Sequence, residues 1–139
     1  MMVDGKNAIF NDKLIFMTDK THELLERTFN FGIKVLIDLS KLPYNDITAV
    51  PRRQFAKAAT SIGANYEEAQ AAESKRDFIH KIGVVCKETR ESNYWARVLE
   101  AICNDASQKN QFKEYKEESD ELKRIFTSIK LSAEKNLKK

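Results

Sequence analysis

The sequence predicts an all-α protein, an antiparallel four-helix bundle with up-down-up-down connections. Residues that interrupt helices are scarce, with 4 Gly and 2 Pro among 139 residues. Apolar residues recur at spacings of three and four in four long segments, which is the pattern of a helix with one buried face. The connections between these segments are short, so helices that follow one another must run antiparallel.

The whole chain, residues 1–139, is predicted to form a single domain. A chain of this length can bury roughly two thirds of its unfolded surface without disulfides. Cys86 and Cys103 fall in one predicted helix and are too far apart along it to pair. No apolar stretch approaches the roughly 20 residues of a membrane span. The first ten residues have neither the basic region nor the apolar run of a signal peptide. We therefore expect a cytoplasmic protein with no membrane partner.

The chain begins with a lead-in segment and a strongly apolar helix. Residues 1–18 lack sustained periodicity and are expected to dock through Ile9, Phe10, Leu14 or Phe16. The first helix should span 19–42, because the residue before Pro43 is pushed out of the helical region. Apolar residues surround most of this helix, more than one bundle-facing stripe requires. They are Leu24, Leu25, Phe29, Phe31, Ile33, Val35, Leu36, Ile37 and Leu39.

Three further helices are expected at 48–73, 75–104 and 108–135. Thr48 is the predicted N-cap of the second helix, with Pro51 tolerated in its first turn. The third helix should begin after Ser74, with Asp77 three residues later in a weak capping box. The fourth repeats its apolar positions in alternating steps of three and four, like a coiled-coil seam.

Polar residues at helical spacing mark one face on each of the second and third helices. These residues are Ser61, Asn65 and Glu68 on the second helix and Glu88, Glu91 and Trp95 on the third. The first interpretation is a structural polar seam where the two helices pack, with the Asn65 amide hydrogen-bonded inside the bundle. In this interpretation Trp95 and Phe78 are largely buried. The alternative is a functional pocket.

The charges of the second helix run against its dipole. Arg52, Arg53 and Lys57 lie near its start, and acidic residues lie near its end. A helix dipole favours the opposite arrangement, so other groups should compensate. Ion pairs with another helix or subunit are one interpretation, and an anionic partner such as RNA is the other.

Lysines form a stripe along the fourth helix. Lys109, Lys116, Lys123 and Lys130 recur every seven residues, with Lys113 beside them. Lysines that flank a helical seam commonly lay their stems over apolar neighbours and keep the ammonium in water. The alternative is a track for a phosphate backbone.

No catalytic, metal or cofactor site is predicted. Asp19 precedes His22, and Asp77 precedes His80, at the Glu-x-x-His spacing of di-iron bundles. The acid is the shorter Asp, however, and each pair falls in the first turn of its helix rather than in the middle of the bundle. A glycine-rich phosphate loop is also missing from the sequence. We therefore expect a protein that is not an enzyme.

One stretch of the chain resembles a known family. It comprises Thr60-Ser61-Ile62-Gly63-Ala64-Asn65, Glu68-Ala69, Ser74-Lys75, Asp77-Phe78, Lys87-Glu88, Glu91 and Tyr94-Trp95. Their order and spacing resemble the four-helix-bundle proteins encoded in intervening sequences of bacterial 23S ribosomal RNA genes. The related accessory proteins of diversity-generating retroelements are more distantly similar; they are pentamers that bind nucleic acid and contact a reverse transcriptase.

The resemblance implies a homopentameric ring without enzymatic activity. It also implies structural rather than catalytic roles for the matching residues, which are Ser61, Gly63, Asn65, Glu68, Phe78, Glu88, Glu91, Tyr94 and Trp95. Our functional hypothesis is an oligomeric bundle that binds RNA or a ribonucleoprotein. The predicted contacts are the cluster of Arg52, Arg53 and Lys57 and the lysines of the fourth helix. The rival hypothesis is a protein-binding scaffold with no nucleic-acid contact.

Overall fold

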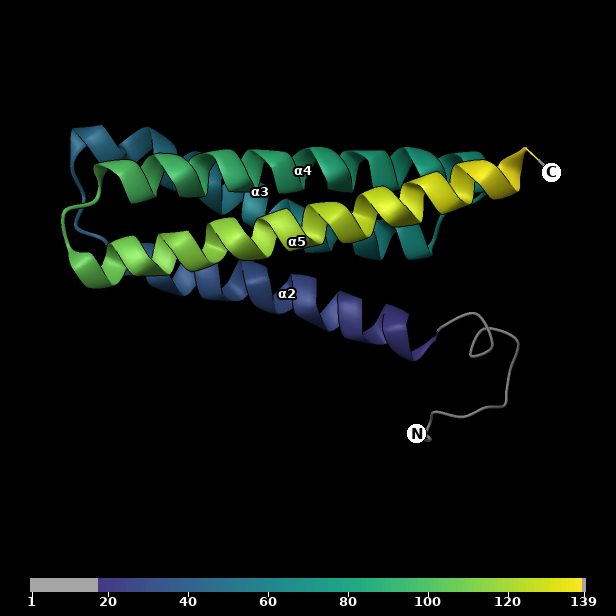
Figure 1. Cartoon of the computed structure of the whole chain (residues 1–139), viewed down its shortest axis with the longest axis horizontal. Coiled ribbons are helices and arrows are strands. Elements are labelled where there is room, and N and C mark those ends of the chain that lie inside the picture. Colours follow the sequence, from purple (N-terminus) through teal and green to yellow (C-terminus); the bar gives the residue numbers. More distant parts are fainter. Residues whose placement is uncertain (1–17, 139) are drawn as a thin grey trace.

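A computed structural model describes residues 18–138 as four helices joined by short connections (Figure 1). The helices are α2 (Asp19–Ser40), α3 (Asp46–Gln70), α4 (Lys75–Ile102) and α5 (Ala106–Leu137). Successive helices run antiparallel, which confirms the up-down-up-down all-α bundle. The residues expected to dock from the lead-in segment, Ile9, Phe10, Leu14 or Phe16, lie outside the described part of the chain.

Each helix begins with a side-chain cap. Thr18, Asn45, Ser74 and Asp105 accept a hydrogen bond from the backbone N–H three residues later. The prediction of Ser74 is confirmed, and that of Thr48 is wrong. Asn45 has the extended backbone of an N-cap, and its Oδ1 accepts from the Thr48 N–H at 3.0 Å. Asparagine is among the strongest N-cap residues, so α3 begins earlier than the sequence pattern predicts.

The helix ends also shift by a few residues. α3 ends at Gln70 instead of 73, because Ala71 leaves the helical conformation before Ser74 takes the extended backbone of the next N-cap. α5 is longer than the predicted 108–135 at both of its ends. These shifts affect only the ends of the helices and do not change which residues share a helix face.

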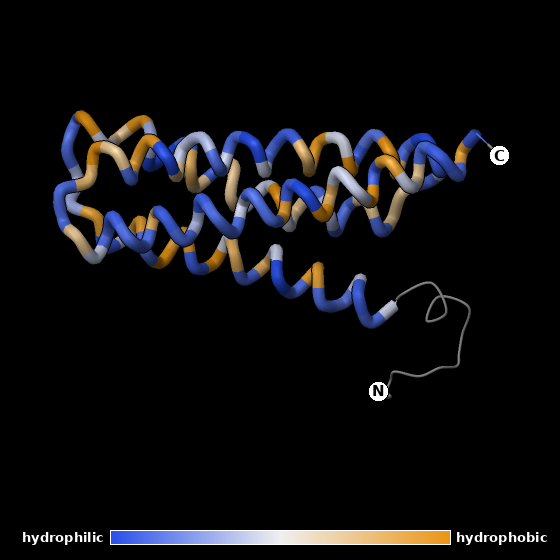
Figure 2. The backbone as a smooth tube through the Cα atoms, in the orientation of Figure 1, coloured by the Kyte–Doolittle hydropathy of each residue, from blue (hydrophilic) through white to orange (hydrophobic). Residues whose placement is uncertain are grey.

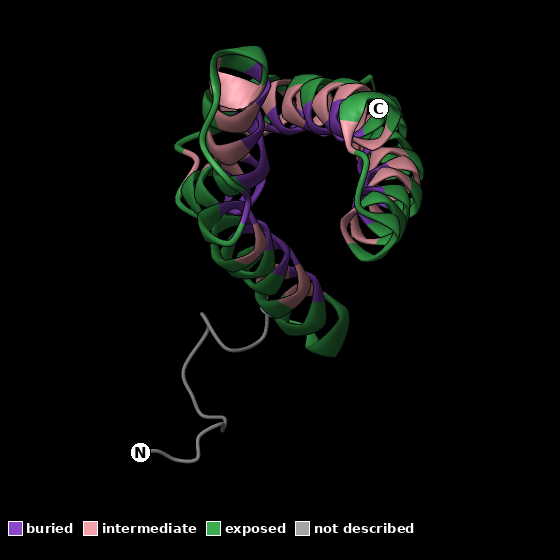
Figure 3. Ribbon diagram, turned by 90° about the vertical axis from the view of Figure 1, so that its left-hand side faces the viewer, coloured by how far each residue is buried: buried purple, intermediate pink, exposed green. Residues whose placement is uncertain are grey.

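The four helices form an arc that is more open between α2 and α5 than elsewhere (Figure 3). The backbones of α2 and α3, of α3 and α4, and of α4 and α5 approach closely. Long side chains join α2 to α5 instead, including the pair Arg27 and Glu118. Buried residues face the inside of the arc (Figure 3). Along each helix, hydrophobic and hydrophilic residues alternate as an amphipathic bundle requires (Figure 2).

Aromatic rings fill much of the core. Phe31 of α2 and Phe55 of α3 both pack edge-on against Tyr115 of α5, with ring centroids 5.7 and 5.9 Å apart. Tyr66 packs against Phe126 at 4.9 Å. Core side chains from α2, α3 and α5 therefore meet across the open side of the arc. Phe78 and Trp95, predicted to lie in the core, are only partly buried and pack against its edge.

Two glycines allow α2 and α3 to cross closely. A Cβ atom added to Gly63 would lie 3.3 Å from the backbone nitrogen of Phe29, and one added to Gly32 would lie 3.3 Å from the Cα of Thr60. Each glycine thus faces the backbone of the other helix. Side chains at these positions would push the two helices apart.

Candidate functional site

One side of α2 carries large apolar side chains that the bundle leaves exposed. Phe29, Ile33, Leu36 and Ile37 are 57%, 40%, 42% and 50% exposed. Their spacing places them on one helix face, which we call the apolar face of α2. The core residues Phe31, Val35 and Leu39 occupy the opposite side. A continuous apolar surface of this kind usually marks an interface.

Arg52, predicted as a nucleic-acid contact, is bound within the protein. Its Nη1 and Nη2 atoms donate to the carbonyl oxygens of Leu39 and Leu42 at 3.2 and 2.5 Å. The guanidinium also lies over the Tyr44 ring, 5.8 Å from its centroid. These carbonyls lie at the C-terminal end of α2, where a positive charge is favoured by the helix dipole. The apparent mismatch of charge on α3 is therefore compensated in part by the end of α2.

Arg53 and Lys57 remain exposed on α3. Lys57 lies close enough to Glu88 of α4 to oppose the rise in the pKa of that carboxyl. Among the described residues, no ion pair within 4.0 Å engages Arg53 or Lys57. The exposed part of the predicted basic cluster is thus this pair of residues.

The lysine stripe of α5 turns toward α4. Lys109 Nζ donates to the Glu100 carbonyl at 2.5 Å, and Lys116 Nζ lies 3.2 Å from Glu100 Oε1. The end of the Lys130 side chain lies over Gly83. Lys116, Lys123 and Lys130 are partly buried, whereas Lys113 and Lys109 are exposed. This geometry favours the interpretation that the stripe flanks a helical seam. α4 separates it from Arg53 and Lys57, so the predicted basic residues do not form one site.

The predicted polar seam is not linked by hydrogen bonds across α3 and α4. Ser61 Oγ donates to the Lys57 carbonyl at 2.7 Å, and Asn65 Nδ2 donates to the Ser61 carbonyl at 2.8 Å. Both bonds stay within α3, and no hydrogen bond joins the three α3 members to the three on α4. The Asn65 amide is hydrogen-bonded as predicted, but to its own helix and with only partial burial.

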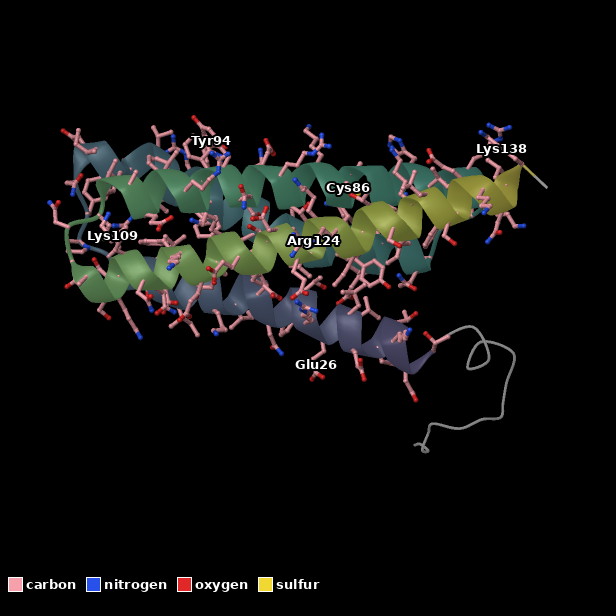
Figure 4. All side chains as sticks on the ribbon, in the orientation of Figure 1. Glu26, Cys86, Tyr94, Lys109, Arg124 and Lys138 are labelled. Carbon is pink, nitrogen blue, oxygen red and sulfur yellow. The ribbon has the colours of Figure 1, made fainter. Side chains whose placement is uncertain are left out.

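On α4 the seam residues form a partly exposed polar and aromatic surface. Burial raises the pKa of the Glu88 carboxyl, and the neighbouring charge of Glu91 raises it further. Trp95 packs edge-on against Tyr94 at 4.9 Å, and Arg97 lies over the Tyr94 ring at 5.6 Å. Tyr94 points outward from the bundle (Figure 4). Glu68 and Glu91 are exposed, so this region is a surface rather than an interior seam.

Sequence reasoning missed the polar contacts that hold α2 against α5. The Tyr115 hydroxyl donates to Asp38 Oδ2, and Gln111 Nε2 donates to the same oxygen at 2.5 Å. Burial of Tyr115, together with its bond to Asp38, raises the pKa of the hydroxyl above its usual range. Arg27 contacts Glu118 and Glu121 at 2.7 and 3.0 Å. Each partner lies far away in sequence, so helical spacing carried no signal for these pairs.

Asn93 was also missed as a link between α4 and α5. Its Nδ2 donates to the Lys116 carbonyl at 3.0 Å and to Asp120 Oδ1 at 3.1 Å. Its Oδ1 accepts from Arg97 Nε at 3.0 Å. The sequence offered one signal for this link. Asn93 is a polar residue next to the buried Ser92, on a helix that packs against both α3 and α5.

The acidic residue of one predicted Asp-x-x-His pair has a structural role at a helix start. Asp77 Oδ2 accepts from the Glu73 N–H at 3.1 Å, and Asp77 Oδ1 lies 3.2 Å from Lys81 Nζ. These contacts lower the pKa of the Asp77 carboxyl, the backbone bond most strongly. Residues 18–138 contain no group of three His, Cys, Asp or Glu side chains placed to hold a metal ion. None of the helices in this range is long and apolar enough to cross a membrane.

Comparison with known proteins relates this bundle to one family. The family described as "23S rRNA-intervening sequence protein" matches residues 20–128, which include most of the four helices. The chain belongs to this family. The residues that carry the sequence resemblance, from Thr60 to Trp95, lie within the match, on α3, α4 and their connection.

A solved structure supports the family fold. It is described as a protein of unknown function from the S23 ribosomal protein family of Bacteroides thetaiotaomicron VPI-5482. This chain is 27% identical to it, with a TM-score of 0.67, and the alignment covers 77% of this chain and 97% of that one. A search of curated proteins gives no match. The 23S rRNA-intervening sequence protein family thus accounts for the four-helix architecture, and its solved relative adds no assigned activity.

Proposed function

We propose that this member of the 23S rRNA-intervening sequence protein family is a non-catalytic scaffold that self-associates through the apolar face of α2 and binds RNA. The observation that carries self-association is the set of four large apolar side chains exposed along one side of α2. Burying such a surface contributes roughly 25 cal/mol per Å² of apolar area. A ring is the closed arrangement in which this face meets a different face of the next copy. Five copies follow from the family resemblance alone.

Light scattering after size exclusion tests the self-association. The full chain at micromolar concentration should give about five times the 16.0 kDa chain mass. A variant with Ile33→Glu and Ile37→Glu should give a lower mass, because two charges would have to be desolvated in the interface. Leu131→Glu is the matched control, since Leu131 is also apolar and 60% exposed but lies on α5. A monomeric parent protein would refute the scaffold.

The RNA part of the proposal depends on exposed positive charge and on the family. The family's description associates its members with 23S rRNA. Arg53 and Lys57 are exposed side by side, one helical turn apart, on α3. Repetition of this surface around a ring would present several such clusters to one RNA, which raises the overall affinity through multivalency.

Binding of a 23S rRNA fragment at several salt concentrations tests the RNA contact. The log of the association constant should fall with log salt by about 0.7 to 0.9 for each neutralised phosphate. Arg53→Gln with Lys57→Gln should reduce this slope and weaken binding. Lys34→Gln with Lys41→Gln is the control, because it removes the same charge from exposed positions at α2. Equal effects of the two variants would exclude Arg53 and Lys57 as contacts.

A protein-binding scaffold is the second candidate. It is favoured by the engagement of Arg52, Lys109 and Lys116 in contacts within the bundle, which leaves fewer basic residues for RNA. An assembly that keeps its mass but binds no RNA at moderate salt would support it. Stoichiometric metal in elemental analysis of the purified protein would instead contradict the non-catalytic proposal.

A further inference from the structure

A second exposed apolar surface lies on the outer side of α3 and α4. It contains four large apolar side chains, two near the start of α3 and two toward the end of α4. They are Ile47, Val50, Tyr94 and Ile102, which are 72%, 48%, 49% and 37% exposed. The start of α3 and the end of α4 lie at the same end of the bundle, on the left in Figure 1. We call these four residues the α3/α4 patch.

The antiparallel pairing of α3 and α4 brings the two halves of this patch together. Val50 lies 20 residues before the last residue of α3, and Trp95 lies 20 residues after the first residue of α4. Because the two helices pack closely and a short connection joins them, Val50 and Trp95 lie at the same level of the bundle. Trp95 is partly buried and packs edge-on against Tyr94, with ring centroids 4.9 Å apart.

The two halves of the patch also lie on facing sides of their helices. Lys57 of α3 lies close enough to Glu88 of α4 for its charge to favour the ionised carboxylate. Val50 precedes Lys57 by seven residues and Trp95 follows Glu88 by seven, which is about two helical turns in each case. Val50 and Trp95 therefore occupy the same sides of α3 and α4 as that neighbouring pair. The remaining members follow along these sides at spacings of three and seven residues, at Ile47 and Ile102.

The apolar face of α2 and the α3/α4 patch cannot meet within one chain. Gly63 marks the side of α3 that faces the backbone of α2. At roughly 100° per residue, Ile47 lies about 160° around α3 from Gly63, on the side away from α2. The apolar face of α2 lies on the side of that helix opposite its core residues. A single copy therefore leaves both surfaces exposed.

The two surfaces match each other in size and chemistry. Each presents four large uncharged side chains, and at roughly 100 Å² for each half-exposed side chain, each surface amounts to about 400 Å². A stable interface buries about 800 Å² on each partner, and a little over half of that area is apolar. Each surface therefore supplies most of the apolar area that one such interface requires.

We propose that the apolar face of α2 in one copy binds the α3/α4 patch of the next copy. This inference rests on the self-association proposed above and names the surface that receives the α2 face. Two different surfaces meet in this contact, so each pair of copies still presents one face and one patch, and association continues until a ring closes. Lys57, two turns from Val50, lies at the rim of the contact, where charged groups remain accessible to solvent.

Two charged variants, studied alone and together, test the pairing. The face variant carries Ile33→Glu and Ile37→Glu, and the patch variant carries Ile47→Glu and Val50→Glu. Negative charge is favoured in the first turns of a helix, so the patch variant should keep the helical content of the parent in circular dichroism. In light scattering, either variant alone should have the mass of one 16.0 kDa chain, because every contact would have to desolvate two charges.

Mixing the two variants should restore one contact. The intact face of the patch variant can bind the intact patch of the face variant, whereas the other two surfaces carry the added charges. The mixture should therefore contain a dimer of about twice the chain mass and no larger species. Thr127→Glu with Leu131→Glu is the matched control, because both positions are exposed on α5 and belong to neither surface. This control should keep the mass of the parent.

Cross-linking detects the same contact without added charges, and so also covers a patch variant that fails to fold. In a background with Cys86→Ala and Cys103→Ala, chains with Ile33→Cys are co-expressed with chains with Val50→Cys and treated with a flexible bismaleimide. One of the two chains carries a mass tag. Cross-linked dimers should contain one chain of each kind, and should be several-fold less abundant when either chain is present alone.

The results distinguish this inference from self-association itself. A folded patch variant that keeps the mass of the parent, while the face variant loses it, would overturn the inference by assigning the patch to a different partner. Cross-links between two Ile33→Cys chains, or a face variant that dimerises, would overturn it by showing that like surfaces meet. An oligomeric parent that gives neither a mixed dimer nor a mixed cross-link would also overturn it. All of these results leave self-association in place, whereas a monomeric parent refutes both.

Discussion

Arg52 and Arg53 are adjacent in the sequence and have different surroundings. Arg52 donates to two carbonyl oxygens at the end of α2, while Arg53 points to solvent. The sequence pattern grouped them because both are basic and both lie in the first turns of α3. Only the position of the α2 end separates an arginine that holds two helices together from one that is available to a partner.

This difference predicts unequal effects on stability. Arg52→Gln should lower the free energy of unfolding by about 1–3 kcal/mol, because the carbonyls of Leu39 and Leu42 lose a charged donor. Arg53→Gln should change it by no more than about 0.5 kcal/mol, as surface substitutions usually do. Urea denaturation of both variants measures the difference. Similar losses would contradict the role of Arg52 as a donor to the carbonyl oxygens at the end of α2.

Tyr115 predicts a loss of stability at high pH. The pKa of its hydroxyl is raised in the folded state by burial first and by its bond to Asp38 second. The neutral form is thus preferred in the folded state, and this contribution is complete below the unfolded pKa of about 10 and is lost as the pH rises beyond it. The urea midpoint should fall between about pH 9 and 11. The urea midpoint of the Tyr115→Phe variant should fall less over the same pH interval. An identical fall in the two proteins would exclude Tyr115 as the cause.

At the scale of helices, packing is decided by small residues as much as by apolar stripes. Gly32 and Gly63 let α2 and α3 approach so closely that an added Cβ would meet the opposite backbone. Gly63 also belongs to the segment that resembles the family. Its role here is physical, because only a residue without a side chain fits at that crossing.

Substitutions at Gly63, which lies at this crossing, and at Gly83, which lies on α4 away from it, should have opposite effects on stability. Gly63→Val should lower the free energy of unfolding by about 1–3 kcal/mol, since the helices must separate to admit the side chain. Gly83→Ala should raise it by about 0.5–1 kcal/mol, because alanine favours the helix and its Cβ would meet only the flexible end of Lys130, at 3.7 Å. Thermal and urea melts of both variants give the two signs. Stabilisation by Gly63→Val would show that the crossing is not tightly packed.

In the molecule as a whole, the apolar face of α2 is the side of that helix that the bundle does not cover. Phe29, the most exposed member, is 57% exposed, although a side chain of this kind is usually buried in a folded protein. This face lies on the side of α2 opposite the buried residues Phe31, Val35 and Leu39. Association of copies would remove it from water.

Self-association predicts a melting temperature that depends on protein concentration. Because the assembled state is favoured by mass action, the melting temperature should rise as concentration rises. The Ile33→Glu and Ile37→Glu variant should melt at the same temperature over the same range of concentration. Differential scanning calorimetry of both proteins provides the comparison. A melting temperature of the parent that does not change would contradict association through this face.

The fold class, the number and approximate bounds of the helices and the family could all be predicted from the amino-acid sequence. These follow from local spacing, from turn residues such as Pro43 and from caps such as Ser74, all of which act over a few residues. The predicted start of α3 was wrong because both Asn45 and Thr48 are residue types that can cap a helix, and Asn45 is the one that does so. The wide apolar distribution of the first helix also indicated correctly that its surface exceeds what the bundle buries.

The contacts of the charged and polar residues, in contrast, could not be predicted without the packed bundle. Arg52 faces the end of α2, Lys116 pairs with Glu100, and Asn65 bonds to its own helix. Helical spacing assigns a residue to a face but not to a neighbour. The neighbour depends on how far each helix is shifted and rotated against the next, which the packing of the whole core determines.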